Sequence, residues 1–275
     1  MKILGGTSRV SVLTLRKALD EKVNNLSATD AAQFSNDLFT ILTVLSSSVG
    51  VRRALTDNAR DAAAKAELIS NLFGSNISAA AQSLLATAAS LRWSNPSELA
   101  DAIEQIAVEA ESVVADKNNE LDKLEDQLFD FARVLVANRD LRQALNTAAD
   151  SDAGRVLLLE SVVKGKYATS TVNLLRRVVV LRRGRHIDAT LAAYSHYVSV
   201  RRNRVVAHVR TAVALTPAQQ QNLIAALGKA IGKTVHINVE VDPKVLGGIS
   251  IRYGDEVIDG TVINRLAEAS RALVG

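Results

Sequence analysis

The residues that most often form metal sites do not fall into the required spacings in this chain. There is no Cys, so no thiolate nucleophile or thiolate metal ligand is available. The four His residues are scattered, and none belongs to the His-x-x-x-His or His–carboxylate patterns that bind zinc; they are His186, His196, His208 and His236. The sequence therefore predicts no metal site.

Catalytic and phosphate-binding patterns are missing as well. The Gly5-Gly6 and Gly247-Gly248 pairs lack the Lys-Ser/Thr that follows a phosphate-binding loop, and no G-x-S-x-G nucleophile elbow occurs. Three nearby carboxylates, Asp255, Glu256 and Asp259, could suggest acid–base chemistry. Turns and helix caps use such residues far more often. We therefore expect no catalytic residues and no cofactor.

Charge is unevenly distributed along the chain, although its net value is only +4. The segment 98–126 holds ten acidic residues against two Lys, and the segment 176–210 holds nine Arg against one Asp. The Arg-rich segment could bind nucleic acid or an acidic partner. Its two aromatic residues, Tyr194 and Tyr197, do not alternate with the arginines as base-stacking platforms, so a solvated helix face that balances the acidic helix is favoured. A basic nucleic-acid-binding adaptor remains the alternative.

Composition predicts helices packed on helices. Of the 275 residues, 48% are hydrophobic, only 4% are aromatic and three are Pro. No uninterrupted apolar run reaches the roughly 18 residues of a membrane-spanning helix. Any membrane association is therefore expected to come through partners.

Helical periodicity fills the first 204 residues. A first helix over 8–24 is expected to turn Val10, Leu13 and Leu19 inward. A second helix begins at the Ser27/Asp30 capping pair. Its inward stripe consists of Phe34, Leu38, Ile41, Leu42 and Leu45. Further helices are predicted over 61–73, 79–92, from Asn95-Pro96 onward, and over 187–204. A seam of Leu121, Leu124, Leu128, Phe131 and Leu135 indicates another bundle helix. Trp93 could be an exposed anchor for a partner, but packing between helices is favoured.

The helical part repeats itself at a constant offset of 90 residues. The segment 37–55 aligns with 127–145 without a gap, and seven pairs in it are identical: Leu38/Leu128, Phe39/Phe129, Val44/Val134, Leu45/Leu135, Arg52/Arg142, Ala54/Ala144 and Leu55/Leu145. The same offset pairs residues of two further helices, Leu68 with Leu158, and Leu84-Leu85 and Leu91-Arg92 with Leu174-Leu175 and Leu181-Arg182. We interpret it as a duplication. The predicted domains are 1–104, an additional helical bundle; 105–204, a second bundle; and 205–275. The helix near 96–114 is expected to serve both copies.

The last 70 residues change to period-two alternation. Segments 205–213, 235–241 and 249–253 read as strands, and a capped helix from Thr216-Pro217 to Gly232 lies between the first two. The Gly247-Gly248 bend between the second and third strands suggests that these two form a small antiparallel sheet. Gly248 is expected to need a backbone conformation, or a close approach, that a β-carbon forbids. A closing helix is predicted over 261–274. The fold class is thus mainly α, with duplicated bundles followed by a small α/β domain.

The segment 235–254 also resembles the C-terminal signature of the delta subunit of bacterial ATP synthase, the oligomycin sensitivity conferral protein family. The matching positions are Val235, Ile237, Val241, Asp242, Val245, Gly247, Gly248, Ile249, Ile251, Arg252 and Gly254. The following segment 257–262, which contains Asp259, resembles the family as well. The resemblance covers 105–275 directly and 1–104 only through the repeat, so the chain resembles the extended form seen in actinobacteria.

The resemblance implies a function for the chain. It implies a non-catalytic stator subunit that links the alpha subunits of the catalytic head to the b subunits of the peripheral stalk, so that rotation stays coupled to ATP synthesis and proton transport. The expected location is peripheral, at the cytoplasmic face of the bacterial cell membrane, with membrane contact only through partners and no nucleic acid bound. The signature residues are expected to be structural or interface residues.

Overall fold

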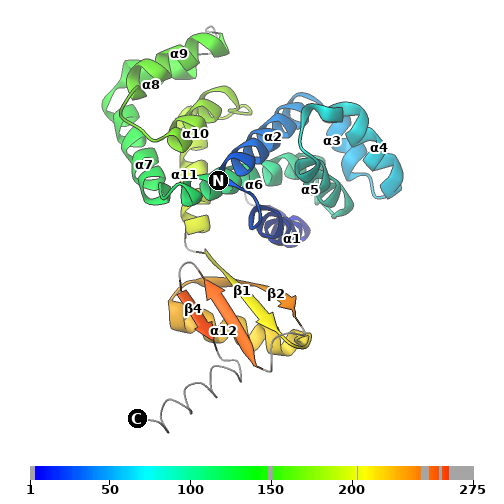
Figure 1. The fold of residues 1–275 in the computed structure, drawn as a ribbon. Coiled ribbons are helices and arrows are strands. Elements are labelled where there is room, and N and C mark those ends of the chain that lie inside the picture. Colours follow the sequence, from blue (N-terminus) through cyan, green and yellow to red (C-terminus); the bar gives the residue numbers. More distant parts are fainter. Residues whose placement is uncertain (1–3, 148–150, 203, 243–247, 254–255, 260–275) are drawn as a thin grey trace, which may run out of the picture. The chain divides into compact units, whose positions relative to one another are not determined.

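The computed structural model describes residues 4–147, 151–202, 204–242, 248–253 and 256–259. The chain forms two compact units, Met1–Arg201 and Arg202–Gly275. In the described residues the first unit is entirely helical, and the second combines one helix with a four-stranded sheet (Figure 1). The predicted fold class, mainly α with a small α/β end, is confirmed.

Five of the first six helices begin at a residue whose side chain caps the helix, and α1 is the exception. The six helices are α1 (Gly6–Val23), α2 (Ala28–Ser47), α3 (Val49–Thr56), α4 (Ala62–Phe73), α5 (Ala79–Ser90) and α6 (Pro96–Lys117), with a 3₁₀ turn at Gly74–Asn76. The Ser27 side chain accepts the N–H of Asp30 at the start of α2. The Asn95 side chain caps α6, which has Pro at its first position. The five predicted inward residues of α2 are all buried.

The next five helices repeat the pattern of the first set. They are α7 (Leu121–Ala137), α8 (Arg139–Asn146), α9 (Asp152–Val163), α10 (Thr169–Val180) and α11 (Ile187–Arg202). Helices α8, α9 and α10 begin and end 90 residues after α3, α4 and α5, respectively. Four of the five seam residues of α7 are buried, and Leu121 is half-buried. The offset found in the sequence therefore recurs in the helix boundaries.

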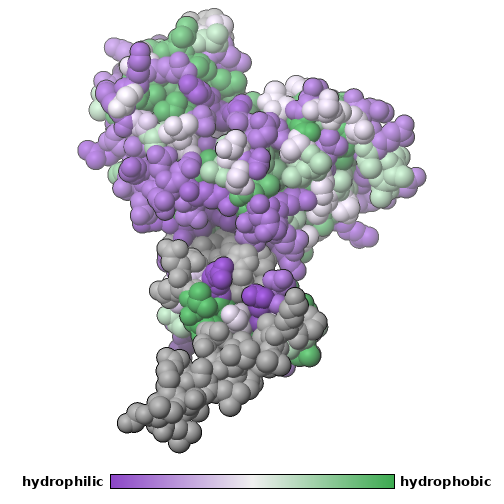
Figure 2. Space-filling view, in the orientation of Figure 1, coloured by the Kyte–Doolittle hydropathy of each residue, from purple (hydrophilic) through white to green (hydrophobic). Residues whose placement is uncertain are grey.

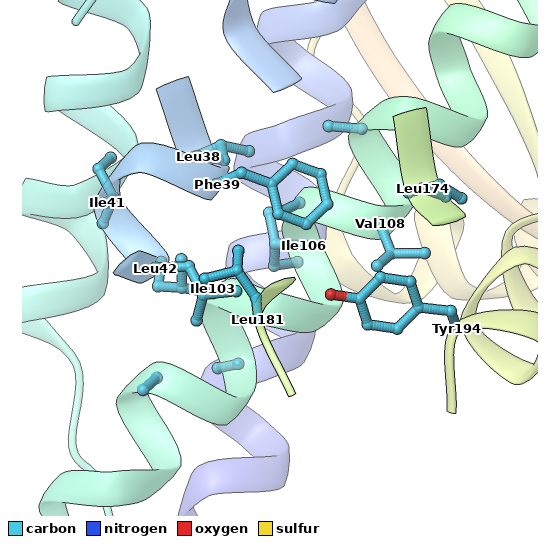
Figure 3. Close-up of a cluster of buried hydrophobic side chains, with 14 of the residues drawn as sticks. Leu38, Phe39, Ile41, Leu42, Ile103, Ile106, Val108, Leu174, Leu181 and Tyr194 are labelled. Atoms are coloured by element: carbon cyan, nitrogen blue, oxygen red, sulfur yellow. The ribbon is translucent and has the colours of Figure 1, made fainter. Parts of the chain in front are cut away.

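Helix α6 lies at the centre of the helical unit. It contacts α1, α2 and α3 on one side and α7 and α10 on the other, and its apolar residues join one continuous core. Figure 3 shows Phe39 of α2, Ile106 of α6, Leu174 of α10 and Tyr194 of α11 in a single cluster. The predicted border at residue 104 falls inside α6. The assignment of 1–104 and 105–204 as separate copies therefore stays a proposal, with α6 contacting helices of both.

The predicted inward face of α1 was wrong. Val10 and Leu13 are 64% and 55% exposed, and of the three expected residues only Leu19 is buried. The helix instead turns Val12, Leu15, Leu19 and Val23 inward, together with buried Ser8, Ser11 and Asp20. The prediction failed because Ser8, Ser11 and Asp20 are polar yet lie on the buried side of α1, where each has a hydrogen-bond partner.

The second unit is built on a mixed sheet. Its elements are β1 (Arg204–Thr211), α12 (Pro217–Ile231), β2 (Thr234–Val241), β3 (Ile249–Tyr253) and β4 (Glu256–Asp259). The strand order is β2-β1-β3-β4, with β1 parallel to β2 and the other neighbours antiparallel. Ala207 and Val209 of β1, Val235 of β2 and Ile251 of β3 form the core with Leu227 of α12, which lies behind the sheet in Figure 1.

The expected pairing of the two signature strands was wrong. β1 lies between β2 and β3 and pairs with both, with Val209 opposite Val239 on one side and Ile251 on the other. A Gly-containing bend between two strands favours a hairpin, but β1 pairs with β2 along all eight residues of each strand and also pairs with β3. The predicted helix over 261–274 lies outside the described residues.

Within the described residues, no single helix is long and apolar enough to cross a membrane. Helices α2 and α3 are long and apolar enough for a membrane span only when they are counted together, and the chain bends by 106° between them. The apolar stripe of α2 is buried in the protein core.

Candidate interface surfaces

Buried carboxylates on α6 bind arginines from the segment between α10 and α11. The Glu104 side chain is 2% exposed and pairs with Arg183 at 3.0 Å and with Arg185. Arg183 also pairs with Asp101 at 2.7 Å. A buried charge is costly unless it is paired. These pairs therefore fix the α10–α11 segment against α6.

Glu111 connects α6 to helices on both of its sides. Its carboxylate accepts hydrogen bonds from Ser35 Oγ of α2 at 2.7 Å and from Asn173 Nδ2 of α10 at 3.2 Å. Burial raises the pKa of Glu111, although these hydrogen bonds and the nearby Arg177 favour its charged form. Glu111 is thus a polar contact that joins α6 to both α2 and α10.

Phe39 of α2 is covered by residues of α10 and α11. The Arg177 guanidinium of α10 lies 5.0 Å from the centre of the Phe39 ring, a cation–π distance. Arg177 Nη2 also donates to Asn36 Oδ1 at 3.1 Å. The Tyr194 ring of α11 lies 6.5 Å from Phe39, and burial raises the pKa of the Tyr194 hydroxyl. An aromatic ring and an amide together hold one arginine.

The Arg-rich segment is largely engaged inside the protein. Arg176 pairs with Glu160, Arg182 donates to the Asn146 carbonyl, and Arg201 pairs with Asp20. Arg177, Arg183 and Arg185 also make contacts within the protein, so all six arginines contribute to holding the helices together. The reading in which this segment balances acidic residues is favoured over a nucleic-acid surface. Trp93 packs against the core and donates to the Ala88 carbonyl at 2.9 Å, as a packing role predicts.

No group of three or more His, Asp or Glu side chains that could hold a metal ion occurs among the described residues. Of the three carboxylates considered for acid–base chemistry, Asp255 and the side chains of Glu256 and Asp259 lie outside the described part of the chain. The polar side chains of the clusters described above form ion pairs and hydrogen bonds within the protein.

The outer face of α1 is an exposed apolar strip that sequence reasoning missed. Val10 and Leu13 lie on it, three residues apart, beside the exposed Arg9 and Lys17. Ninety residues later, Ala100 and Ile103 of α6 are fully buried. Comparing positions at the repeat offset could have identified the strip, because the equivalent residues of α6 lie in the core while those of α1 are exposed. Figure 2 shows a second apolar area over α8 and α9, where Leu157 of α9 is 67% exposed.

The signature residues divide between the core and the surface of the second unit. Val235 and Ile251 are buried, Ile237 and Ile249 pack partly buried beside them, and Val241 is 48% exposed at the end of β2. Arg252 is exposed. Val245, Gly247, Gly254 and the side chain of Asp259 lie outside the described residues. Val235, Ile237, Ile249 and Ile251 therefore belong to the core of the sheet or pack against it.

Two signature residues shape the ends of strands. The Asp242 N–H donates to the Thr211 carbonyl at 2.9 Å, and its carboxylate pairs with Arg210, so Asp242 fixes the end of β2 to β1. Gly248, just before β3, has a φ of +83°, a value that residues other than Gly rarely adopt. The first of the two reasons expected for a Gly there, a special backbone conformation, is the one observed.

Comparison with known proteins identifies the family. The profile described as the ATP synthase delta (OSCP) subunit matches residues 109–273. The chain is 38% identical over 272 residues to "ATP synthase subunit delta" of Streptomyces griseus, covering 99% of this chain and 100% of that protein. It is 39% identical over 270 residues to the protein of that name from Kineococcus radiotolerans, covering 98% of each. The chain belongs to the ATP synthase delta (OSCP) subunit family.

Proposed function

We propose that this chain is a non-catalytic stator subunit of a proton-translocating F-type ATP synthase. It joins the alpha subunits of the catalytic head to the b subunits of the peripheral stalk. The observation that carries the proposal is the similarity to curated delta subunits over nearly the whole length of the chain. A likeness of this extent includes the additional helical copy before residue 109, which the family profile does not cover.

The mechanical requirement agrees with the organisation of the chain. Rotation of the central shaft exerts torque on the head, so a stator needs two separate and firm attachments. The chain has two compact units, each with a hydrophobic core of its own. A disturbance at one attachment would then leave the other intact.

The helical unit is the proposed head-binding part. An amphipathic helix can lay its apolar side into an apolar strip between helices. The α1 strip with Val10 and Leu13 offers such a surface, because the equivalent positions of α6, Ala100 and Ile103, are already buried inside the protein. We therefore place an N-terminal helix of an alpha subunit on α1.

The α/β unit is the proposed stalk-binding part. Its edge strand β4 exposes Val257 and Ile258, which are 56% and 45% exposed. We place the b subunits on this unit. The protein would then be peripheral, held at the cytoplasmic face of the cell membrane by its partners.

A binding experiment with the purified full-length chain tests the proposal. The chain is mixed with isolated head, with soluble b subunits, and with both, and the complexes are weighed by native mass spectrometry. The proposal requires a ternary complex that does not form without this chain. Binding to only one partner, or to DNA in preference to both, would refute it.

A further inference from the structure

Phe39 and Phe129 are identical residues 90 positions apart, yet their environments are opposite. Phe39 of α2 is 2% exposed, whereas Phe129 of α7 is 66% exposed. The difference arises because the second copy covers Phe39, while among the described residues no third copy follows to cover Phe129. The surface around Phe129 is therefore the counterpart of an internal interface.

The internal interface shows what chemistry this surface accepts. On α2, the Phe39 ring and Asn36, three residues earlier on the same helix face, together hold the Arg177 guanidinium. The ring supplies the cation–π contact and the amide oxygen accepts a hydrogen bond. Two groups one helical turn apart thus make a receptor for one arginine.

Helix α7 repeats the receptor with a stronger acceptor. Asp126 stands 90 residues after Asn36, and both Asp126 and Phe129 are exposed. A carboxylate binds a guanidinium more strongly than an amide does, and it can do so through two hydrogen bonds. The same side of α7 carries two acidic residues, Asp122 and Glu125, toward its start and one basic residue, Arg133, further along. Val136, two turns beyond Phe129, is 75% exposed.

We propose that the Phe129–Asp126 surface of α7 docks an amphipathic helix of another subunit that presents an arginine. The guanidinium stacks on the Phe129 ring and binds the Asp126 carboxylate. Apolar residues of the same helix lie against Phe129 and Val136, and the acidic residues of α7 favour a basic partner. This inference rests on the proposed function, since it needs neighbouring subunits of the assembled enzyme.

Site-specific photo-crosslinking in the assembled enzyme tests the surface directly. A benzophenone amino acid replaces Phe129, and in a matched control it replaces Lys123, which is exposed on another side of α7. We expect a crosslink from position 129, mapped by mass spectrometry, to a helical segment of another subunit with an Arg within one turn. No crosslink in enzyme that retains the chain, a segment without an Arg, or a second copy of this chain would overturn the proposal.

Charge exchange then tests the arginine itself. Phe129→Ala and Asp126→Arg should each weaken rebinding of the chain to enzyme stripped of it by roughly three- to thirtyfold. Changing the crosslinked Arg to Asp should restore binding to the Asp126→Arg chain only. Equal rebinding of all variants would overturn this inference alone. Failure of the wild-type chain to rebind would instead overturn the proposed function.

Discussion

Asp37 and Gln127 occupy equivalent positions 90 residues apart and make the same contact. Asp37 Oδ2 accepts the N–H of Ser78 at 2.8 Å, at the start of α5, and Gln127 Oε1 accepts the N–H of Ala168 at 2.9 Å, at the start of α10. The same hydrogen bond is thus present at both positions although the residue type has changed. An acceptor at this position is the shared requirement.

Removal of that acceptor should destabilise the helical unit. Asp37→Ala leaves the part-buried Ser78 N–H without its partner and should cost about 1–3 kcal/mol. Asp37→Asn keeps an acceptor oxygen and should cost clearly less. Urea denaturation followed by circular dichroism measures both variants, and equal losses would contradict the assigned role.

Glu111 should make stability depend on pH. Burial raises its pKa in the folded protein above the ordinary value of 4.5, so the folded state binds its proton more readily than the unfolded state does. Stability from this group is therefore greatest at low pH and is lost as the pH rises from about 4.5 through the raised folded-state pKa.

Glu111→Gln removes this titration and can keep hydrogen bonds to Ser35 and Asn173. We expect the variant to gain stability relative to wild type at pH 8, and the gain to shrink as the pH approaches 4.5. Denaturation midpoints across this range provide the measurement. A difference between the two proteins that does not change with pH would show that Glu111 does not titrate in this way.

Gly248→Val should damage the α/β unit selectively. Valine strongly disfavours the φ of +83° found at Gly248, so the change should cost roughly 1–3 kcal/mol through backbone strain. The helical unit has its own core and should keep its helical content and its binding to the head. Hydrogen exchange should show faster exchange in β1 and β3. Gly50→Ala, inside helix α3, is the control and should be harmless.

Leu13→Glu should weaken binding to the head without unfolding the chain. Leu13 is 55% exposed, so its replacement changes stability little, but a buried leucine contact in the complex contributes about 1.5–3 kcal/mol. Val49→Glu, on the 52% exposed Val49 of α3, is the control. Calorimetric titration with an alpha-subunit N-terminal peptide compares them. Equal affinities of the peptide for Leu13→Glu and for wild type would show that the head does not bind at this surface of α1.

Local signals in the sequence predicted much of the fold, because they act within a few residues. Ser27, Asn95-Pro96 and Thr216-Pro217 mark helix starts through bonds to their own backbone neighbours. The constant offset of 90 in the sequence also recurs in the bounds of α8, α9 and α10 relative to α3, α4 and α5. Such signals do not depend on distant packing.

Long-range partners could not be read in the same way. The Ser11 hydroxyl donates to the Arg92 carbonyl at 2.6 Å, so a polar residue lies inside where periodicity favoured Val10 and Leu13. Alternation identified β2 and β3 as strands, but it carries no information on neighbours, and β1 was found between them. The surfaces at Leu13 and Phe129 emerge only when the environments of equivalent residues are compared.

The most direct test of the stator role is ATP-driven proton pumping by membranes stripped of this chain. We predict that stripped membranes release the head at low salt and no longer pump protons. Any head that stays bound should still hydrolyse ATP. Adding back the purified wild-type chain should restore both attachment and pumping. Normal pumping and firm attachment without the chain would contradict the stator role.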